Sequence, residues 1–253
     1  MARAAFDDYR KEILHQRAIW EKKPVVRKMY HHRYEKVVRA LSPLRPVIEI
    51  GSGCGNFKEY FPEAVSTDVF PSGPWIDRIM DAHDLDLADR EAGNLVLFDC
   101  IHHLQRPLRF LRRAAAALQT GGRLILCEPA ITHWSRFIWS NFHHEPIDSE
   151  WDLFGLDALP PEPDPARIFA NGGIPEILFW THRAKTLELL PSLRLVEASK
   201  FGFVLGPATG GFSNRSLVPN LGFSTLLKLE DALTRPFARR LTGMHMVIVL
   251  EKV

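Results

Sequence analysis

The sequence predicts an α/β fold with a doubly wound parallel sheet, preceded by a helical N-terminal cap. Three observations lead to this prediction. Short apolar runs of strand length alternate with amphipathic helical patterns across residues 46–128. A glycine-rich turn, Gly51 to Gly55, directly follows the first of these runs. The length of 253 residues suits one such domain with additions, so we expect a single domain over residues 1–253.

The composition excludes several classes of protein. The chain is 46% hydrophobic and 25% charged, as is usual for globular proteins. Its three cysteines, Cys54, Cys100 and Cys127, form no CxxC motif and no disulfide pattern, which suits a reducing cytoplasm. No apolar run is long enough to span a bilayer, and the charged N-terminus lacks a signal-peptide core. We therefore expect a soluble, cytoplasmic enzyme.

Positive charge gathers in residues 1–45, where twelve lysines and arginines face five acidic residues, although the whole chain carries only +2. A basic arm can bind an anionic substrate, nucleic acid or a membrane surface. More often it is the solvated face of amphipathic helices. Residues 4–21 and 25–41 have helical apolar spacing, and prolines at 43 and 46 end the pattern, so we expect residues 1–45 to form a helical cap.

Carboxylates stand at or near the ends of the predicted strands. Glu49 lies in the strand before the glycine turn, Asp68 ends the second strand at residues 64–68, and Asp99 ends the fourth at residues 94–99. Parallel strands bring their carboxyl ends to one edge of the sheet, where ligands bind. An acid at the tip of the second strand can accept hydrogen bonds from both hydroxyls of a ribose. The sequence therefore predicts a nucleotide-type site at this edge.

The other elements follow from periodicity and from glycine or proline breaks. Residues 69–75 are too short and too broken for a full crossover helix, and Gly121-Gly122 is expected to stop the helix before it. The further predicted helices cover residues 56–61, 107–118, 183–190 and 223–241, and the further strands cover residues 76–80, 123–127, 193–201 and 244–251.

Residues 130–183 interrupt the alternation. Aromatic side chains mix here with histidines, and four prolines between positions 160 and 165 forbid regular structure nearby. A long aromatic insertion after the fifth strand would lie at the carboxyl edge of the sheet, where it can cover a substrate. We therefore expect a substrate lid that contains the stretch His143-His144-Glu145-Pro146.

Together these motifs resemble a class I S-adenosylmethionine-dependent methyltransferase of the bacterial small-molecule or sugar type. The resemblance is strong over residues 46–128, and the last two predicted strands match the usual ending of the family. It implies a Rossmann-like seven-stranded sheet with an antiparallel last strand. The motifs that carry it are Glu49 to Gly55, Asp68, Asp81-Ala82, Asp99 with His102-His103-Leu104, and Gly121-Gly122-Arg123-Leu124.

The resemblance also implies how S-adenosylmethionine would bind. The loop at Gly51, Gly53 and Gly55 would contact its amino-acid part, and Glu49 would support this loop or accept a hydrogen bond from the ammonium group. Asp68 would bind the ribose hydroxyls. The remaining contacts would be Val69 against the adenine, Asp81 and Ala82 beside its amino group, and Asp99, Cys100 and His103 on the methionine side.

The transferred methyl group is already activated in a sulfonium, so the protein mainly aligns the acceptor and excludes water. A hydroxyl acceptor usually needs a base, and histidine is the natural choice. We expect O-methylation of a small molecule or glycan, such as a sugar or a secondary metabolite. His143 or His144 would be the base and Glu145 its orienting partner, although such a histidine can equally bond within its loop.

Other assignments are weighed against this one. Either His102 or His103 could be the base, but a structural role beside the cofactor is favoured. We expect no metal, because adjacent histidines such as His143 and His144 rarely chelate one ion, even with Glu145 and Glu128 nearby. An RNA methyltransferase would use the basic arm, but no Asn-Pro-Pro-Tyr-like tetrapeptide is present.

Two further classes remain. A non-catalytic partner subunit would keep the loop and bind no acceptor, against which the complete motif set argues. A nicotinamide dehydrogenase is disfavoured because the third glycine of its motif would fall on Asn56.

Overall fold

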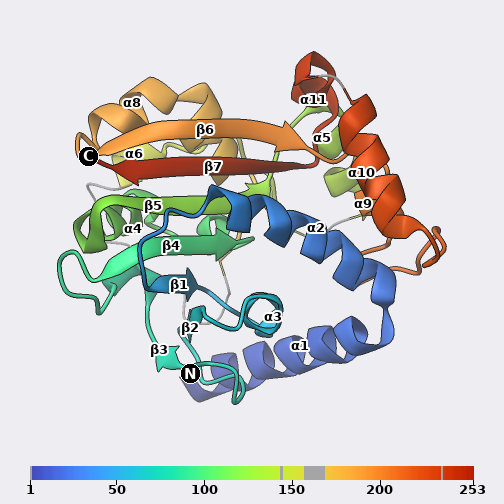
Figure 1. The fold of residues 1–253 in the computed structure, drawn as a ribbon, viewed down its shortest axis with the longest axis horizontal. Helices are drawn as coiled ribbons and strands as arrows, with labels where there is room; N and C mark the ends of the chain where they lie inside the picture. The colour runs from blue at the N-terminus through green and yellow to red at the C-terminus, as the bar shows by residue number, and fades with distance from the viewer. Residues whose placement is uncertain (1, 143–144, 157–168, 235) are drawn as a thin grey trace.

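The computed structural model describes residues 2–142, 145–156, 169–234 and 236–253. Its centre is a seven-stranded sheet in the order β3-β2-β1-β4-β5-β7-β6. The strands β2 and β3 lie on one side of β1, and β4 and β5 lie on the other. Strand β7 lies between β5 and β6 and is antiparallel to both, which confirms the predicted fold (Figure 1). The strands are β1 Val47–Ile50, β2 Val65–Asp68, β3 Arg78–Ile79, β4 Ala92–Phe98, β5 Leu118–Pro129, β6 Leu193–Phe201 and β7 His245–Lys252.

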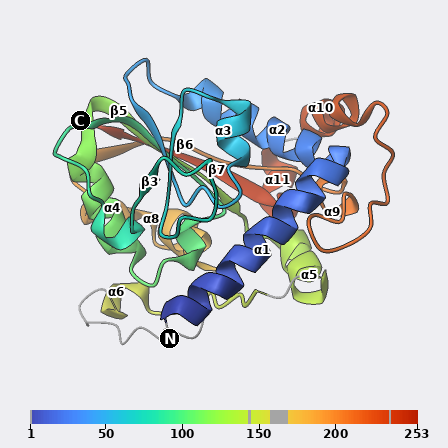
Figure 2. The same ribbon diagram turned by 90° about the horizontal axis from the view of Figure 1, so that it is seen from below.

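Helices cover both faces of the sheet. Figure 2 shows α2 and α3 on one face and α4 and α8 on the other, with α1 crossing in front. The main helices are α1 Ala2–Lys22, α2 Pro24–Ala40, α3 Asn56–Tyr60, α4 Pro107–Ala117, α5 His133–Phe142, α8 Arg183–Glu188, α10 Phe223–Leu233 and α11 Pro236–Thr242. Short elements are η1 Ala82–Asp84, η2 Ile101–His103, α6 Leu153–Leu156, α7 Ile174–Glu176, the π-helical turn η3 Ile177–Thr181 and α9 Leu205–Ala208.

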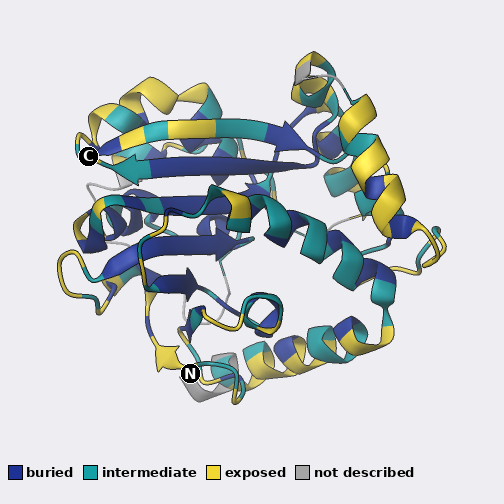
Figure 3. Cartoon of the chain, in the orientation of Figure 1, coloured by how far each residue is buried: buried dark blue, intermediate teal, exposed yellow. Residues whose placement is uncertain are grey.

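The two faces of the sheet form two apolar clusters. Alternate residues of β1 and β4 point to opposite faces, so Ile48 and Leu95 join the cluster under α4, whereas Val47 and Val96 join the cluster under α2. Both faces are covered, and β1 and β4 are therefore mostly apolar. Both strands are buried along their whole length, as Figure 3 shows. The residues at the carboxyl ends of the parallel strands are therefore the ones available to form a site.

The structure corrects two predicted boundaries. The pair Gly121-Gly122 does not stop a helix: α4 already ends at Ala117, and β5 runs from Leu118 through both glycines. A Cβ at Gly122 would lie 2.7 Å from the carbonyl oxygen of Gly93, so glycine is needed there because two strands approach closely. The third strand is also shorter than residues 76–80, since only Arg78 and Ile79 pair with β2.

Several helices gather beyond the carboxyl ends of the parallel strands (Figure 1). α5 comes from the predicted insertion at residues 130–183, and α10 packs against α2 through Phe223 and Leu227. The prolines between positions 160 and 165 lie outside the described residues. Among the helices that the structure describes, none is long and apolar enough to cross a membrane.

The close packing of the chain at Gly93 gives a direct test of the fold. A Cβ there would lie 2.3 Å from the backbone nitrogen of Arg45, which cannot move away as a side chain could. Gly93→Ala should therefore destabilise the protein by about 1–3 kcal/mol, seen as a melting temperature several degrees lower. Gly206→Ala is the control, because its Cβ would meet only Met29 Sδ, at 3.8 Å. Equal melting temperatures for the two variants would contradict this packing.

Candidate functional site

The glycine turn leaves β1 in a conformation that requires glycine. Gly51, Gly53 and Gly55 have φ angles of 72°, 51° and 71°, in the left-handed region. Space is restricted as well, because a Cβ at Gly51 would lie 2.5 Å from the sulfur of Cys100. The turn therefore brings bare backbone against the start of the segment that follows β4.

Asp68 lies beside this turn, as predicted, and is buried. Its carboxylate accepts hydrogen bonds from the backbone N–H of Gly53 at 2.8 Å and of Phe70 at 3.2 Å. It also accepts from the hydroxyl of Tyr9, at 3.0 and 3.2 Å to its two oxygens. Burial raises the pKa of Asp68, although these hydrogen bonds oppose the effect. The tip of the second strand is thus tied to the turn and to α1.

Helix α1 covers the glycine turn. Arg17 donates a hydrogen bond to the carbonyl of Cys54 at 2.8 Å and stacks over the ring of Trp75, 5.1 Å from its centre. Trp75 in turn donates to the carbonyl of Gly53 at 2.8 Å. Phe6 and Tyr9 both pack on Phe70. The N-terminal cap is therefore part of the candidate site, and the sequence analysis did not identify Tyr9 as one of its residues.

Helix α2 supplies a buried cation to the same edge. Arg33 forms a bidentate pair with Asp99, with N–O distances of 2.5 and 2.7 Å. Burial favours the neutral acid, but the charge of Arg33 holds the pKa of Asp99 at about 2. Arg33 was also missed, although a charged residue between Met29 and Val37 on the apolar face of α2 was a usable signal.

Glu49 differs from the other acids of this edge. Its side chain is 3% exposed, and Oε2 has no hydrogen-bond partner within the described part of the chain. Burial raises the pKa of Glu49 to about 8. A hydrogen bond from Ser52 opposes this shift only in part. A buried carboxyl oxygen without a partner is costly, so Oε2 is suited to receive a cationic or hydrogen-donating group of a ligand.

The predicted adenine-side residues lie farther along the edge. Asp81 accepts hydrogen bonds from the backbone N–H of His83 at 2.8 Å and from its ring at 2.9 Å, and so caps η1. Ala82 is buried beside it, whereas Val69 is about half exposed. The hydrogen bonds to His83 hold the pKa of Asp81 below its ordinary value, so Asp81 is a charged acceptor.

A second group of polar residues surrounds η2, which follows β4. Glu128, at the end of β5, is fully buried and accepts the backbone N–H groups of Cys100 and Ile101 at 2.8 and 3.0 Å. Its other oxygen lies 2.7 Å from His102 Nδ1, which donates to it. Glu128 therefore fixes both the backbone after β4 and the orientation of the His102 ring.

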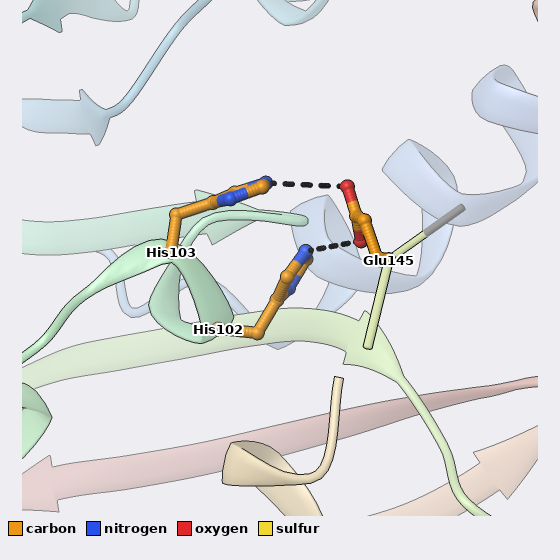
Figure 4. Close-up of side chains that lie close together, drawn as sticks. All are labelled: His102, His103 and Glu145. Carbon is orange, nitrogen blue, oxygen red and sulfur yellow. Dashed lines mark ion pairs between the residues drawn. The ribbon is translucent and has the colours of Figure 1, made fainter. Parts of the chain in front are cut away.

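Glu145 completes this group. One of its oxygens lies 3.3 Å from His102 Nε2, and the other lies 3.8 Å from His103 Nε2, as Figure 4 shows. His103 Nδ1 lies 2.9 Å from the carbonyl oxygen of Phe169 and donates to it. Burial and the neighbouring His102 lower the pKa of His103, so its ring is neutral and Nε2 carries a lone pair. We call His102, His103 and Glu145 the histidine–glutamate cluster.

Asn171 holds the segment of Glu145 in place. Its buried side chain accepts the backbone N–H of Asp148 at 2.9 Å and donates to the carbonyl of the same residue at 3.0 Å. Its own N–H donates to the carbonyl of His102 at 2.8 Å. The insertion is thus joined directly to η2 through Asn171. No sequence motif indicated this contact.

Of the three predicted catalytic residues, only Glu145 can be placed. His143 and His144 lie outside the described residues. The predicted pairing of Glu145 with an adjacent histidine is therefore untested, while its contacts with His102 and His103 were not predicted. Cys100, predicted on the methionine side, is buried against the glycine turn.

A family model described as a methyltransferase domain matches residues 25–160 of the chain. A search of curated proteins found no significant match to this chain. Among solved structures, a methyltransferase in complex with the Trm112 methyltransferase activator from Haloferax volcanii is 12% identical with a TM-score of 0.50, over 98% of this chain and 97% of that one.

Two further structures are similar. An S-adenosylmethionine-dependent methyltransferase from Archaeoglobus fulgidus has 16% identity and a TM-score of 0.49, with 89% of this chain and 94% of that chain covered. Geranyl diphosphate C-methyltransferase from Streptomyces coelicolor has 12% identity and a TM-score of 0.49, with 88% and 77% covered. At these identities the likeness concerns the fold.

The raised pKa of Glu49 predicts a pH-dependent cost. The carboxyl is neutral in the folded state up to a pH of about 8 but ionises near pH 4.5 when unfolded. Its stabilising contribution is thus complete below pH 4.5 and is lost as the pH rises to about 8. Relative to Glu49→Gln, the wild type should lose a few kcal/mol of unfolding free energy across this window. Denaturant unfolding of both proteins at pH 5 and pH 8.5 measures this difference in unfolding free energy. If the free energies of the two proteins change equally with pH, the pKa of Glu49 is not raised in the folded state.

Proposed function

Because the chain belongs to the methyltransferase domain family, its activity is methyl transfer from S-adenosylmethionine, and we propose that the acceptor is an oxygen of a small or medium molecule. A sugar or a secondary metabolite is the proposed class of acceptor. The observation that carries the proposal is the convergence of the glycine turn, Asp68 and the histidine–glutamate cluster at one edge of the sheet.

The residues of this edge suit the cofactor. The glycine turn offers bare backbone to its amino-acid part, and the unpartnered oxygen of Glu49 suits its ammonium group. Asp68 is the acceptor that a ribose diol requires. When bound, S-adenosylmethionine supplies an activated methyl group. We further assign Val69, Asp81 and Ala82 to the adenine side and Asp99, Cys100 and His103 to the methionine side.

The cluster is the reason for proposing an oxygen acceptor. A hydroxyl must lose its proton as it is methylated, so basic groups are needed where the acceptor lies. Cys100 contacts the glycine turn, and the imidazoles of His102 and His103 follow it by two and three residues. In this proposal His143 or His144 accepts the proton and Glu145 orients it. The contacts of Glu145 with His102 and His103 of η2 support a catalytic role for this stretch.

The alternative of an RNA methyltransferase is weakened by the partners of the basic arm. Lys23 donates to the carbonyls of Gly211 and Asn214 at 2.7 and 2.6 Å, and Lys28 donates to Asn220. Arg33 is engaged with Asp99. These three cations are engaged within the protein and are therefore not available to bind phosphates.

The cofactor assignment predicts that Asp68→Ala weakens binding of S-adenosylhomocysteine. Two charge-assisted hydrogen bonds to the ribose would be lost, which corresponds to a loss of affinity of at least roughly tenfold. Isothermal titration calorimetry measures the affinity, and thermal unfolding checks that the variant is folded. Glu150→Gln is the control, since its exposed side chain lies outside the site. Identical affinities for Asp68→Ala and wild type would refute the assignment.

Removal of the Tyr9 hydroxyl should have the opposite effect on the affinity for S-adenosylhomocysteine. Its hydroxyl occupies both oxygens of Asp68, which the ribose would also use, so the two compete. Tyr9→Phe keeps the ring packing on Phe70 and removes the competing donor. It should bind S-adenosylhomocysteine more tightly than wild type, by up to roughly tenfold. The same calorimetric titration decides this, and weaker binding by Tyr9→Phe would mean that the hydroxyl supports the bound state instead.

A further inference from the structure

We propose that His102, His103 and Glu145 bind a divalent transition-metal cation, of the kind that takes imidazole and carboxylate ligands. The potential ligand atoms of these residues, His102 Nε2, His103 Nε2 and the carboxylate of Glu145, all lie within 4.8 Å of one another. Figure 4 shows both rings turned toward the carboxylate. Two imidazoles and one carboxylate form the donor set of many catalytic zinc sites.

The separations fit a single ion. Bonds of about 2.1 Å at tetrahedral angles place two ligand atoms roughly 3.4 Å apart. His102 Nε2 lies 3.3 Å from one oxygen of Glu145, and His103 Nε2 lies 3.8 Å from the other. Both nitrogens therefore lie near this spacing from the carboxylate, and one ligand atom from each of the three residues lies within 4.8 Å of the others.

The groups behind the ligands match those of metal sites. A metal-binding histidine usually donates its second ring N–H to a carboxylate or a backbone carbonyl, which fixes the ring and aims its free nitrogen. His102 donates from Nδ1 to Glu128 at 2.7 Å, and His103 donates from Nδ1 to the carbonyl of Phe169 at 2.9 Å. Both histidines thus have the outer partner that a ligand requires, and each presents Nε2 to the same point.

The charge and exposure of the cluster also suit a dication. Glu128 is fully buried, and Glu145 is about one-third exposed, so two carboxylates converge on the nearly buried ring of His102. Burial lowers the pKa of His102, but hydrogen bonds to these two carboxylates outweigh the effect of burial and raise the pKa to about 10. A dication would therefore replace the proton on His102 Nε2 and lie between the same two carboxylates. His103 and Glu145 keep about a third of their side-chain surface exposed, so one side of the cluster stays open. Three protein ligands and one open position are typical of a catalytic metal site, in contrast to a closed structural one.

The open position gives the cation a use that rests on the proposed function. The acceptor in that proposal is an oxygen, and a bound cation lowers the pKa of an oxygen ligand and fixes its position. The cluster follows Cys100, which lies against the glycine turn. An acceptor hydroxyl on the cation would then lose its proton more easily next to the methyl donor.

Binding of Zn²⁺ tests the site without any need for activity. Protein freed of metal by a chelator is titrated with Zn²⁺ by calorimetry, and the wild type should bind one equivalent. His103→Ala removes a ligand, and Glu145→Gln replaces an anionic ligand with a neutral, weaker one. Each should weaken binding by more than the roughly 10- to 100-fold that loss of an outer partner costs. His133→Ala and Glu150→Gln, at exposed positions outside the cluster, should bind as the wild type does.

The outcomes separate the two proposals. Absence of Zn²⁺ binding by the wild type, or equal affinity in His103→Ala and Glu145→Gln, would overturn the metal site and leave a purely internal ion-pair cluster. Asp68→Ala should keep the Zn²⁺ affinity of the wild type, whereas it should lose affinity for S-adenosylhomocysteine. A protein that binds Zn²⁺ at the cluster but not S-adenosylhomocysteine would support the metal site and refute the cofactor assignment.

Discussion

The site depends on the buried carboxylate of Glu128. A carboxylate with no exposure to solvent is tolerated only when hydrogen bonds satisfy it, and the partners here are two backbone N–H groups and the ring of His102. These bonds make the chain turn sharply after β4. The turn presses Cys100 against the glycine loop and directs His102 and His103 toward the insertion. One buried acid thus links the position of the glycine turn to that of the histidine–glutamate cluster.

The other acids of this edge are also satisfied by hydrogen bonds or ion pairs, with the exception of Glu49. Asp68 is satisfied by Tyr9 and the glycine turn, and Asp99 by Arg33. Each partner comes from the N-terminal cap or the turn, so folding of the cap and formation of the site are coupled. Among these acids, Glu49 is the one with a buried oxygen that has no hydrogen-bond partner in the described chain. An acid that the fold leaves unsatisfied is the one best explained by a ligand.

Much of the fold was predictable because its signals are local. Apolar runs gave the strands, helical periodicity gave α1 and α2, and the glycines marked a turn that only they can form. The predicted helix 107–118 matches α4 to within one residue, but the role predicted for Gly121-Gly122 was wrong. A glycine pair can end a helix or allow close strand packing, and sequence alone does not separate the two uses. Among the site residues, Asp68 was predicted beside the turn because its place at a strand end fixes its location.

Contacts between distant segments were beyond prediction, and the cluster illustrates the reason. No metal was expected from the sequence, because adjacent histidines such as His143 and His144 rarely chelate one ion. Neighbouring side chains in a 3-10 helix also point about 120° apart. In η2, however, the rings of His102 and His103 lie 4.2 Å apart between centres. Glu128 holds one ring by Nδ1, and the carbonyl of Phe169 holds the other. Both outer partners come from elsewhere in the chain, so the geometry that lets neighbouring histidines face one carboxylate belongs to the tertiary structure and not to the motif.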